Sequence, residues 1–447
     1  MNNKVTYFQE LLTSIFERGS SAVRYKDERS LDLLSAALMS ERGEVSGHKI
    51  AAALLDRFEQ ATKEEKVAFF NLLATDYDVQ INDLIQAANA YQSEKSQKTY
   101  ALLRDASAPR RQALLRRLNS VPSATQRLVK MRESLLELIG DHPELGRVDL
   151  DFEHAFSSWF NRGFLVMKRV SWQSPASLLE KIIAYEAVHT INDWDDLRRR
   201  LQPADRRCFA FFHPAMPDEP LIFVEVALTN KTPDSIHAVL AEAREPIDVA
   251  KANTAVFYSI SNCQVGLRGV SFGNFLIKQV ANDLADSLPQ LKSFLTLSPV
   301  PGLVRWSRTA ATESGYADID VGIGLIQSIA DGSSANVLPA QREQVLAAAA
   351  TYFLEAKRPN GLPVDPVSRF HLGNGASLEN IHWMADTSEK GLKQSAGIMV
   401  NYLYDLKKIE ENHEAYARDQ TVLASRAVRA LKLKKEKRGR KTEGEAG

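Results

Sequence analysis

The chain changes its hydrophobic period within residues 256–302, and this change limits the folds open to it more than any other feature. Val256 to Ser261 is a short β-branched and aromatic run that is typical of a strand. From Phe275 to Leu288, apolar residues recur instead at helical spacing. The apolar run that follows ends in a Ser-Pro turn at Ser298. The stretch therefore predicts a strand, a loop, an amphipathic helix and a second strand.

The loop of this unit contains three glycines, Gly266, Gly269 and Gly273. Glycine lets backbone N–H groups come close to a ligand, and the N-terminus of the helix that follows favours anionic oxygen. These properties favour a phosphate or pyrophosphate site. An ordinary strand-to-helix connection, with glycine serving only the turn geometry, explains the loop equally well. The loop alone leaves both interpretations open.

The charge of the chain is balanced, with 56 Lys and Arg residues against 56 Asp and Glu residues, so no global field recruits nucleic acid or an anionic membrane. Cys208 and Cys263 form neither metal-ligand spacing nor a disulfide framework, which suits a reducing compartment. The N-terminus lacks the apolar region of a secretory signal, and the most apolar later stretch, Val345 to Leu354, is too short to span a bilayer. We therefore expect a cytoplasmic protein with no nucleic-acid or membrane partner.

The 447 residues are long enough for two or three domains, and their pattern changes near residue 160. Apolar residues recur at helical spacing almost throughout the first 150 residues, which predicts an all-α helix bundle over residues 1–160. Residues 161–430 are expected to form an α/β domain with a mixed sheet, so the whole chain is of the α+β class. Residues 431–447 cluster basic side chains without an apolar face and are expected to form a disordered tail.

Two local patterns in the second domain give specific expectations. Strands are expected at Cys208–Pro214 and Leu221–Leu228, as a hairpin joined by Met216–Pro220. A helix is expected near the end of the domain, on the apolar residues Leu392, Ile398, Met399, Tyr402 and Leu403.

Two stretches outside the glycine loop carry candidate chemistry. Ser298 ends a strand and is held by two prolines, a rigid support where open sheets present ligands, although a turn-capping serine has the same pattern. His371 follows a loop and precedes a Gly-Asn-Gly run whose backbone could approach a ligand, although a lone histidine is more often a surface or core residue. Three carboxylates could orient His371, and the sequence does not choose among them: Asp365, Glu379 and Asp386.

Several common catalytic templates are missing. The chain has no G-x-S-x-G elbow, no Walker A run and no H-E-x-x-H, so the hydrolase, P-loop and zincin interpretations lose their main support. No metal site is expected, because the other candidate histidines lack ligand spacing with a carboxylate or thiol: His189, His213 and His382.

At these residues the chain resembles the malonyl-CoA decarboxylase family. The matching stretches are residues 157–172, 208–229, 257–280, 294–302 and 370–388, of which the last three are the most specific. The resemblance implies an N-terminal helical domain and a catalytic domain with the acetyltransferase (GNAT-like) fold, in which the loop between a central strand and a helix binds the CoA pyrophosphate. It also implies self-association, often as a tetramer, through the helical domains. The absence of a peroxisomal tail departs from animal members and fits a bacterial one.

The resemblance assigns individual residues as well. It maps the proton-accepting serine of the family onto Ser298 and its proton-donating histidine onto His371. The acyl-CoA loop of the family maps onto Arg268, Gly269, Val270, Ser271, Phe272, Gly273 and Asn274.

The function that the resemblance implies is the decarboxylation of malonyl-CoA to acetyl-CoA and CO2. The thioester carbonyl is itself the electron sink for this reaction, so we expect no metal, biotin or pyridoxal cofactor. Two alternatives remain open from the sequence: an acyltransferase that moves the acyl group to an amine or hydroxyl, and a non-enzymatic acyl-CoA sensor or assembly protein whose helical domain carries the output.

Overall fold

The computed structural model describes residues 27–40, 44–270, 272, 276–311, 314–332 and 339–432. The chain divides into two compact units. Unit 1 consists of Met1–Val166, Phe211–Leu221 and Cys263–Phe272, and unit 2 consists of Met167–Ala210, Ile222–Asn262 and Gly273–Gly447. Two segments that are distant in sequence therefore join the N-terminal residues in unit 1. The domain boundaries at residues 160 and 430 stay a prediction, and residues 433–447 of the expected tail lie outside the described residues.

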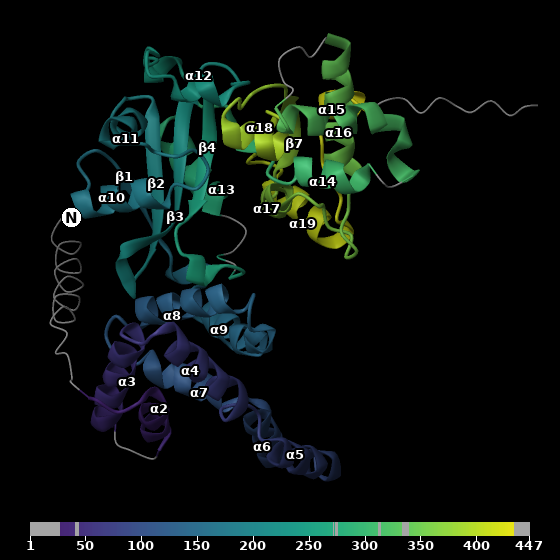
Figure 1. The fold of residues 1–447 in the computed structure, drawn as a ribbon. Coiled ribbons are helices and arrows are strands. Elements are labelled where there is room, and N and C mark those ends of the chain that lie inside the picture. Colours follow the sequence, from purple (N-terminus) through teal and green to yellow (C-terminus); the bar gives the residue numbers. More distant parts are fainter. Residues whose placement is uncertain are drawn as a thin grey trace, which may run out of the picture. The chain divides into compact units, whose positions relative to one another are not determined.

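The N-terminal part of unit 1 is helical, as the periodicity predicts (Figure 1). Its helices are α2 (Leu31–Met39), α3 (Glu44–Glu59), α4 (Lys63–Thr75), α5 (Ile81–Ser93), α6 (Gln97–Ser107), α7 (Arg110–Leu118), α8 (Ala124–Leu138) and α9 (Gly146–Trp159), with 3₁₀ turns η1 (Pro143–Leu145) and η2 (Arg162–Phe164). Thr62 begins α4 with a capping box, in which its side chain accepts from the Glu65 amide while the Glu65 carboxylate accepts from the Thr62 amide.

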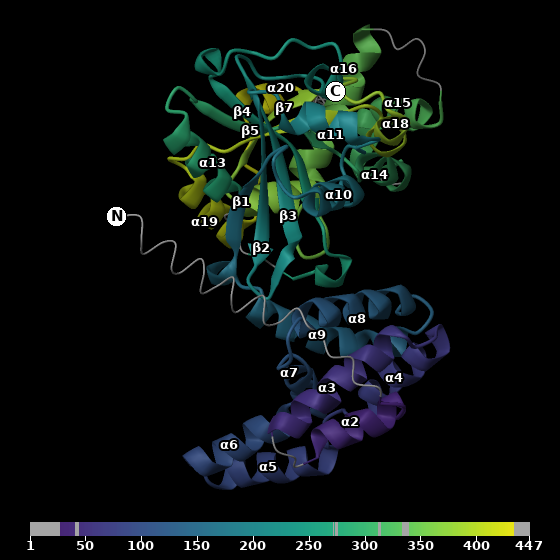
Figure 2. The ribbon, with the colours of Figure 1, turned by 90° about the vertical axis from the view of Figure 1, so that its left-hand side faces the viewer.

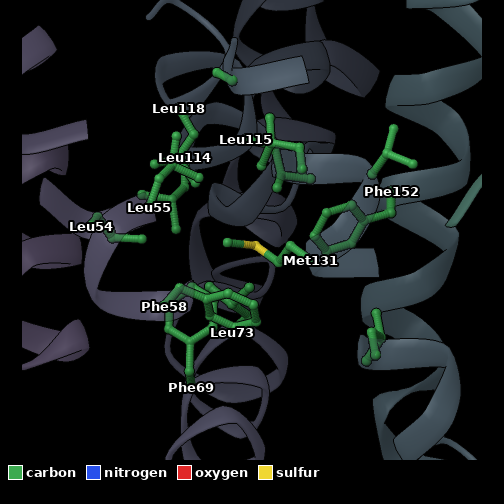
Figure 3. Close-up of a cluster of buried hydrophobic side chains, with 14 of the residues drawn as sticks. Leu54, Leu55, Phe58, Phe69, Leu73, Leu114, Leu115, Leu118, Met131 and Phe152 are labelled. Carbon is green, nitrogen blue, oxygen red and sulfur yellow. The ribbon is translucent and has the colours of Figure 1, made fainter. Parts of the chain in front are cut away.

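The core of unit 1 lies between α3, α4, α7, α8 and α9. Figure 3 shows aromatic and aliphatic side chains from all five helices pointing toward one another, among them Phe58, Phe69, Leu115, Met131 and Phe152. The same cluster contains Met216 and Leu221 of the hairpin segment, together with Leu267 and Val270 of the glycine loop. The burial of these apolar side chains explains why both segments belong to this unit.

The second part of the chain forms a mixed sheet. Its strands are β1 (Val166–Val170), β2 (Arg206–His213), β3 (Met216–Thr229), β4 (Thr254–Asn262), β5 (Ser293–Thr296), β6 (Ser298–Pro299), β7 (Ser377–His382) and β8 (Met399–Leu403), in the order β1-β2-β3-β4-β5-β8-β6 with β7 on β8. The β3–β4 and β5–β8 pairs are antiparallel, and β4–β5 is parallel. A helical region followed by a mixed sheet confirms the predicted α+β class.

The predicted strand–loop–helix–strand unit is present as β4, the loop, α13 (Leu276–Ser287) and β5. Parallel strands need a crossover connection, and α13 supplies it by burying Leu276, Ile277, Val280, Ala281 and Leu284. Figures 1 and 2 show α13 on one face of the sheet, with α10 (Ala176–Tyr185) and α11 (Trp194–Leu201) on the opposite face.

The remaining elements surround the sheet or follow its later strands. They are α12 (Ile236–Leu240), η3 (Val249–Lys251), η4 (Val265–Leu267), α14 (Leu303–Ala310), η5 (Ser314–Ile319), α15 (Asp320–Ala330), α16 (Pro339–Glu355), α17 (Pro366–Gly373), α18 (Glu389–Ser395), α19 (Ile409–Asp419) and α20 (Arg426–Ala430). No helix among the described residues is long and apolar enough to cross a membrane.

Two local expectations are wrong. The hairpin turn is Pro214–Ala215, and residues 216–220 belong to β3, because Met216 and Leu221 are buried in the core rather than left in a solvated loop. The helix expected through Leu403 ends at Ser395, where Ala396 and Gly397 take positive φ, and residues 399–403 form β8. Ile398 to Tyr402 are all buried, including the polar Asn401, and a short run without a clear period fits a central strand as well as a helix.

Candidate active site

Ser298 stands at the start of β6, next to a second hydroxyl. The side chains of residues 296 and 298 lie on the same side of the extended backbone, and the Ser298 hydroxyl donates to Thr296 Oγ1 at 2.8 Å. Ser298 pairs with Val400 of β8 and is only 5% exposed. Ser298 therefore begins the short strand β6, two residues after Thr296 ends β5, rather than ending a strand as predicted.

His371 lies within α17 and is 2% exposed, so it is a buried residue of a helix. Asp365 caps the N-terminus of this helix by accepting from the Ser368 amide at 2.6 Å, and Pro366 follows at the first helical position. The cap fixes where α17 begins, and one and a half turns later the helix presents His371 to β6. The Nε2 atom of His371 is 3.2 Å from the Ser298 hydroxyl oxygen.

Tyr402 and Tyr404 complete the surroundings of the imidazole. The Tyr402 ring stacks on the His371 ring, with centroids 4.5 Å apart and an interplanar angle of 24°. The Tyr404 hydroxyl lies 2.7 Å from His371 Nδ1. Sequence reasoning missed both tyrosines because it assigned this stretch to a helix, whereas the period of two in a strand would have placed residues 402 and 404 on one face.

The imidazole of His371 is neutral in this environment. Burial penalises the imidazolium ion and lowers the pKa of His371 to about 3. Burial also raises the pKa of Tyr404 well above its usual range, so the phenol keeps its proton. A neutral imidazole has one N–H and one bare nitrogen, which makes the tautomer the decisive feature of the site.

The hydrogen bonds favour the tautomer with the proton on Nε2. The Tyr404 hydroxyl makes no other hydrogen bond among the described residues, so it donates to Nδ1 or leaves its proton buried without an acceptor. An unsatisfied buried donor costs about 1–3 kcal/mol. With Nδ1 as acceptor, Nε2–H points at Ser298, whose own hydroxyl hydrogen goes to Thr296.

None of the three candidate carboxylates makes a hydrogen bond to His371. Asp365 caps α17 and accepts a hydrogen bond from the Tyr352 hydroxyl at 3.2 Å, and burial raises the pKa of Asp365 to about 6. Asp386 accepts from the Ser388 amide, and Glu379 is a residue of β7. The orienting group is therefore the phenol of Tyr404, which the sequence did not suggest.

The Gly-Asn-Gly run after His371 ends α17 and packs against protein. Gly375 has φ of +81°, and a Cβ atom there would overlap the carbonyl oxygen of Ile409. The Asn374 amide donates back to the carbonyl oxygens of Phe370 and His371. Gly375 thus allows the backbone to approach α19 closely. This packing explains the glycine without the ligand that the sequence suggested.

The predicted acyl-CoA loop belongs to unit 1 as far as it is described, whereas Ser298 and His371 belong to unit 2. Arg268 is exposed, and its guanidinium has no partner among the described residues. Gly269 takes φ of +85°, and a Cβ atom there would lie 3.2 Å from Glu153 Oε1. Val270 is buried in the core, and Phe272 packs against it. Ser271, Gly273 and Asn274 lie outside the described residues.

The described part of the chain contains no set of metal ligands. No group of three or more His, Cys, Asp or Glu side chains there could hold a metal ion. The polar groups around His371 are hydroxyls and a phenol, which suit hydrogen bonding to an oxyanion better than metal binding.

Two family models match consecutive parts of the chain. The model of the malonyl-CoA decarboxylase N-terminal domain matches residues 77–160, and the model of the malonyl-CoA decarboxylase C-terminal domain matches residues 163–443. Among curated proteins, the mitochondrial malonyl-CoA decarboxylase of Anser anser anser is 33% identical over 452 residues, which cover 93% of this chain and 89% of that protein.

Solved structures give the same result. The malonyl-CoA decarboxylase of Rhodopseudomonas palustris is 50% identical and has a TM-score of 0.85, with 90% of this chain and 98% of that chain covered. The enzyme of Agrobacterium vitis is also 50% identical, with a TM-score of 0.83 and coverage of 90% and 100%. The chain therefore belongs to the malonyl-CoA decarboxylase family.

Proposed function

We propose that the chain decarboxylates malonyl-CoA to acetyl-CoA and CO2 through a thioester enolate, with Ser298 and His371 as the catalytic residues. The carboxy-lyase reaction is that of the family. The single observation that supports the residue assignment is the buried contact of 3.2 Å between the Ser298 hydroxyl and His371 Nε2, which joins the two expected stretches.

For this reaction the protein has to supply hydrogen-bond donors to the enolate oxygen and a proton for the carbon. When the bond to the carboxylate breaks, its electron pair moves into the thioester carbonyl and forms an enolate, and CO2 leaves. Donors aimed at the enolate oxygen stabilise this charge, and the loss of one such donor typically costs about 3–4 kcal/mol of barrier. The electron pair then forms a C–H bond with a proton that the site supplies.

His371 fits the role of donor and proton relay in its neutral form. Its Nε2–H stabilises the enolate oxygen as a hydrogen-bond donor. When the Nε2 proton moves to carbon, a proton from solvent replaces it on Nε2, so that the ring stays neutral. The Tyr404 hydroxyl, 2.7 Å from Nδ1, keeps its own proton and holds the ring in this tautomer. Positioned proton transfer of this kind contributes about 10²- to 10⁴-fold in rate.

Ser298 fits the role of an orienting hydroxyl better than that of a base. A serine hydroxyl is a weak base unless a neighbour accepts its proton, and a neutral His371 with its proton on Nε2 has no lone pair to offer there. Ser298 instead accepts from Nε2–H and donates toward Thr296, or toward the malonyl carboxylate when substrate is bound.

The loop from Arg268 to Asn274 is assigned to the CoA pyrophosphate. The guanidinium of Arg268 has no protein partner among the described residues, and the Gly269 amide donates to no described residue. An exposed cation next to an unpaired N–H, on a backbone with positive φ, is suited to phosphate oxygens.

Self-association through the helical region is the proposed assembly, as in the family. The hairpin of α5 and α6 buries only Ala87 and Thr99 but exposes four large apolar side chains by half or more: Ile81, Ile85, Tyr100 and Leu102. Ile81 and Ile85 lie one turn apart on one face of α5. The proposed occupant of this face is a second copy of the chain. Light scattering should give a multiple of the chain mass for wild type and a smaller mass for Ile85→Glu, whereas Gln86→Glu should keep the wild-type mass.

One assay tests the function against its alternatives. Purified protein is incubated with malonyl-CoA, and CO2 and acetyl-CoA are measured with and without an added amine or alcohol acceptor. Stoichiometric CO2 and acetyl-CoA without an acceptor support decarboxylation. Acyl transfer that depends on the acceptor, or binding without turnover, would instead support one of the alternatives. A cytoplasmic location stays a prediction.

A further inference from the structure

Arg132 is a buried cation of the helical region that holds the backbone of the glycine loop. It lies in the middle of α8, and its side chain is 2% exposed. The NH1 group donates to the carbonyl oxygens of Gly266 at 3.0 Å and Arg268 at 2.8 Å. The Nε and NH2 groups donate to the carboxylate of Asp149 in α9, at 2.6 and 3.3 Å. One guanidinium thus ties two helices to the loop.

These bonds affect the groups that an anion would meet. Peptide carbonyl oxygens repel phosphate oxygens, whereas peptide N–H groups attract them. Arg132 occupies the carbonyls of Gly266 and Arg268, on both sides of Leu267, and thereby fixes the orientation of the peptide units next to Gly269. The Asp149 carboxylate neutralises the buried charge of Arg132. The arginine can therefore fix the loop backbone without leaving an unpaired cation in the core.

The loop is packed tightly against the rest of unit 1, so its backbone has little freedom to adjust if the hydrogen bonds of Arg132 are lost. A Cβ atom at Gly266 would overlap the carbonyl oxygen of Val129, so the loop backbone lies directly on α8. Leu267 and Val270 are 3% and 7% exposed and belong to the core of unit 1. Packing therefore anchors the loop at Gly266, Leu267 and Val270, and Arg132 adds hydrogen bonds to the carbonyl oxygens of Gly266 and Arg268.

We propose that Arg132 is a positioning residue for pyrophosphate binding, and that the helical region is in this way part of the CoA site rather than only a surface for subunit contacts. This inference rests on the proposed role of Arg268 and Gly269 in binding the CoA pyrophosphate. Arg132 touches neither phosphate nor reacting atoms; it acts by holding the loop in the conformation that presents Arg268 and the Gly269 amide.

The test compares Arg132→Lys with Arg127→Lys. Both residues lie on α8 and both make ion pairs, but among the described residues the Arg127 side chain pairs with Asp56 and Glu59 and makes no hydrogen bond to the loop. Lysine keeps the charge opposite Asp149, but its ammonium group cannot reproduce the planar fork that reaches the carboxylate and two carbonyls at once. Each variant is assayed with malonyl-CoA and with malonyl-pantetheine, which carries the same reacting group without the pyrophosphate.

We expect Arg132→Lys to raise KM for malonyl-CoA about tenfold, the equivalent of one charge-assisted hydrogen bond, with kcat nearly unchanged. KM for malonyl-pantetheine should not change, and Arg127→Lys should change neither. Amide hydrogen exchange in residues 263–270 should be faster in Arg132→Lys alone. As a second variant, Gly266→Ala displaces the loop from α8 and should produce the same selective rise in KM.

An equal rise in KM for both substrates, or no rise in a folded Arg132→Lys variant, would overturn the proposal. If Arg268→Ala shows the selective rise and Arg132→Lys does not, the inference fails while the proposed pyrophosphate site stands. If the wild type does not decarboxylate malonyl-CoA, the proposed function fails. The affinity for CoA and the exchange rates then still decide whether Arg132 orders the loop.

Discussion

The Nδ1 atom of His371 lies 2.7 Å from the hydroxyl oxygen of Tyr404, and this hydroxyl makes no other hydrogen bond among the described residues. The contact joins α17 to the residue that follows β8, and the two residues are 33 positions apart in sequence. It decides which imidazole nitrogen carries the proton, and hence what His371 can offer to a substrate on its other side.

Removal of the phenolic hydroxyl should slow turnover without weakening CoA binding. We expect Tyr404→Phe to lower kcat about 10²-fold, because Nδ1 loses its donor and the Nε2–H tautomer loses its advantage. Tyr416→Phe is the matched control, since the Tyr416 hydroxyl is buried without a hydrogen-bond partner and lies on α19. Equal rates for the two variants would contradict the proposed role of Tyr404 in setting the tautomer of His371. The ¹⁵N shifts of His371 provide a direct reading of the tautomer.

Substitutions in the proposed catalytic pair should lower turnover without changing the affinity for CoA. Ser298→Ala and His371→Ala are each expected to keep the affinity for CoA while turnover falls, by about 10²- to 10³-fold for the loss of an oxyanion donor in His371→Ala. CoA affinity from calorimetry and release of labelled CO2 are the two measurements. Wild-type CO2 release by both variants would show that the residue assignment is wrong.

The loop cation should act on binding alone. Arg268→Ala removes a charge-assisted contact to phosphate, worth about 1.5–3 kcal/mol, so KM for malonyl-CoA should rise roughly ten- to hundredfold. Turnover of malonyl-pantetheine should stay at the wild-type level. The substrate dependence of both rates is the measurement, and an unchanged KM for malonyl-CoA would count against the pyrophosphate assignment.

The pH dependence should reflect a histidine that stays neutral. Since burial lowers the pKa of His371 to about 3, kcat/KM should show no inflection between pH 6 and 7 from this residue. In the unfolded chain this histidine binds a proton as the pH falls below about 6.5, whereas in the folded chain it stays neutral until the pH approaches 3. Its contribution to stability is therefore complete above pH 6.5 and is lost as the pH falls toward 3. A loss of activity with an apparent pKa of 6–7, matched by titration of the His371 resonances, would refute this.

The two glycines after His371 should differ sharply in their tolerance of a side chain. Gly375→Ala combines a positive φ with an overlap on the Ile409 carbonyl oxygen and should lower the free energy of unfolding by about 3 kcal/mol. Gly373→Ala meets only Tyr416 Cε1, at 3.8 Å, and should be neutral or stabilising by up to about 1 kcal/mol. Denaturant melts of both variants test the packing role. Similar stabilities would mean that the run serves something other than the α17–α19 contact.

The sequence by itself determined the order of β4, α13 and β5, and it nominated Ser298 and His371 as the proposed catalytic pair. The change from a period of two to a helical period predicted β4, α13 and β5, because amphipathic spacing is a local property of the chain. Ser298 and His371 drew attention because each stands beside proline or glycine residues, and the family resemblance then assigned their expected roles.

Only the tertiary structure decided what those residues contact. Residues 398–402 are all buried, so their pattern could not distinguish a strand from a helix, and the two tyrosines that contact His371 were missed as site residues. The choice of Tyr404 over Asp365, Glu379 or Asp386, and the hold of Arg132 on the loop, depend on pairings across 33 and 134 to 136 residues. Such pairings follow from how the core packs, which no local pattern encodes.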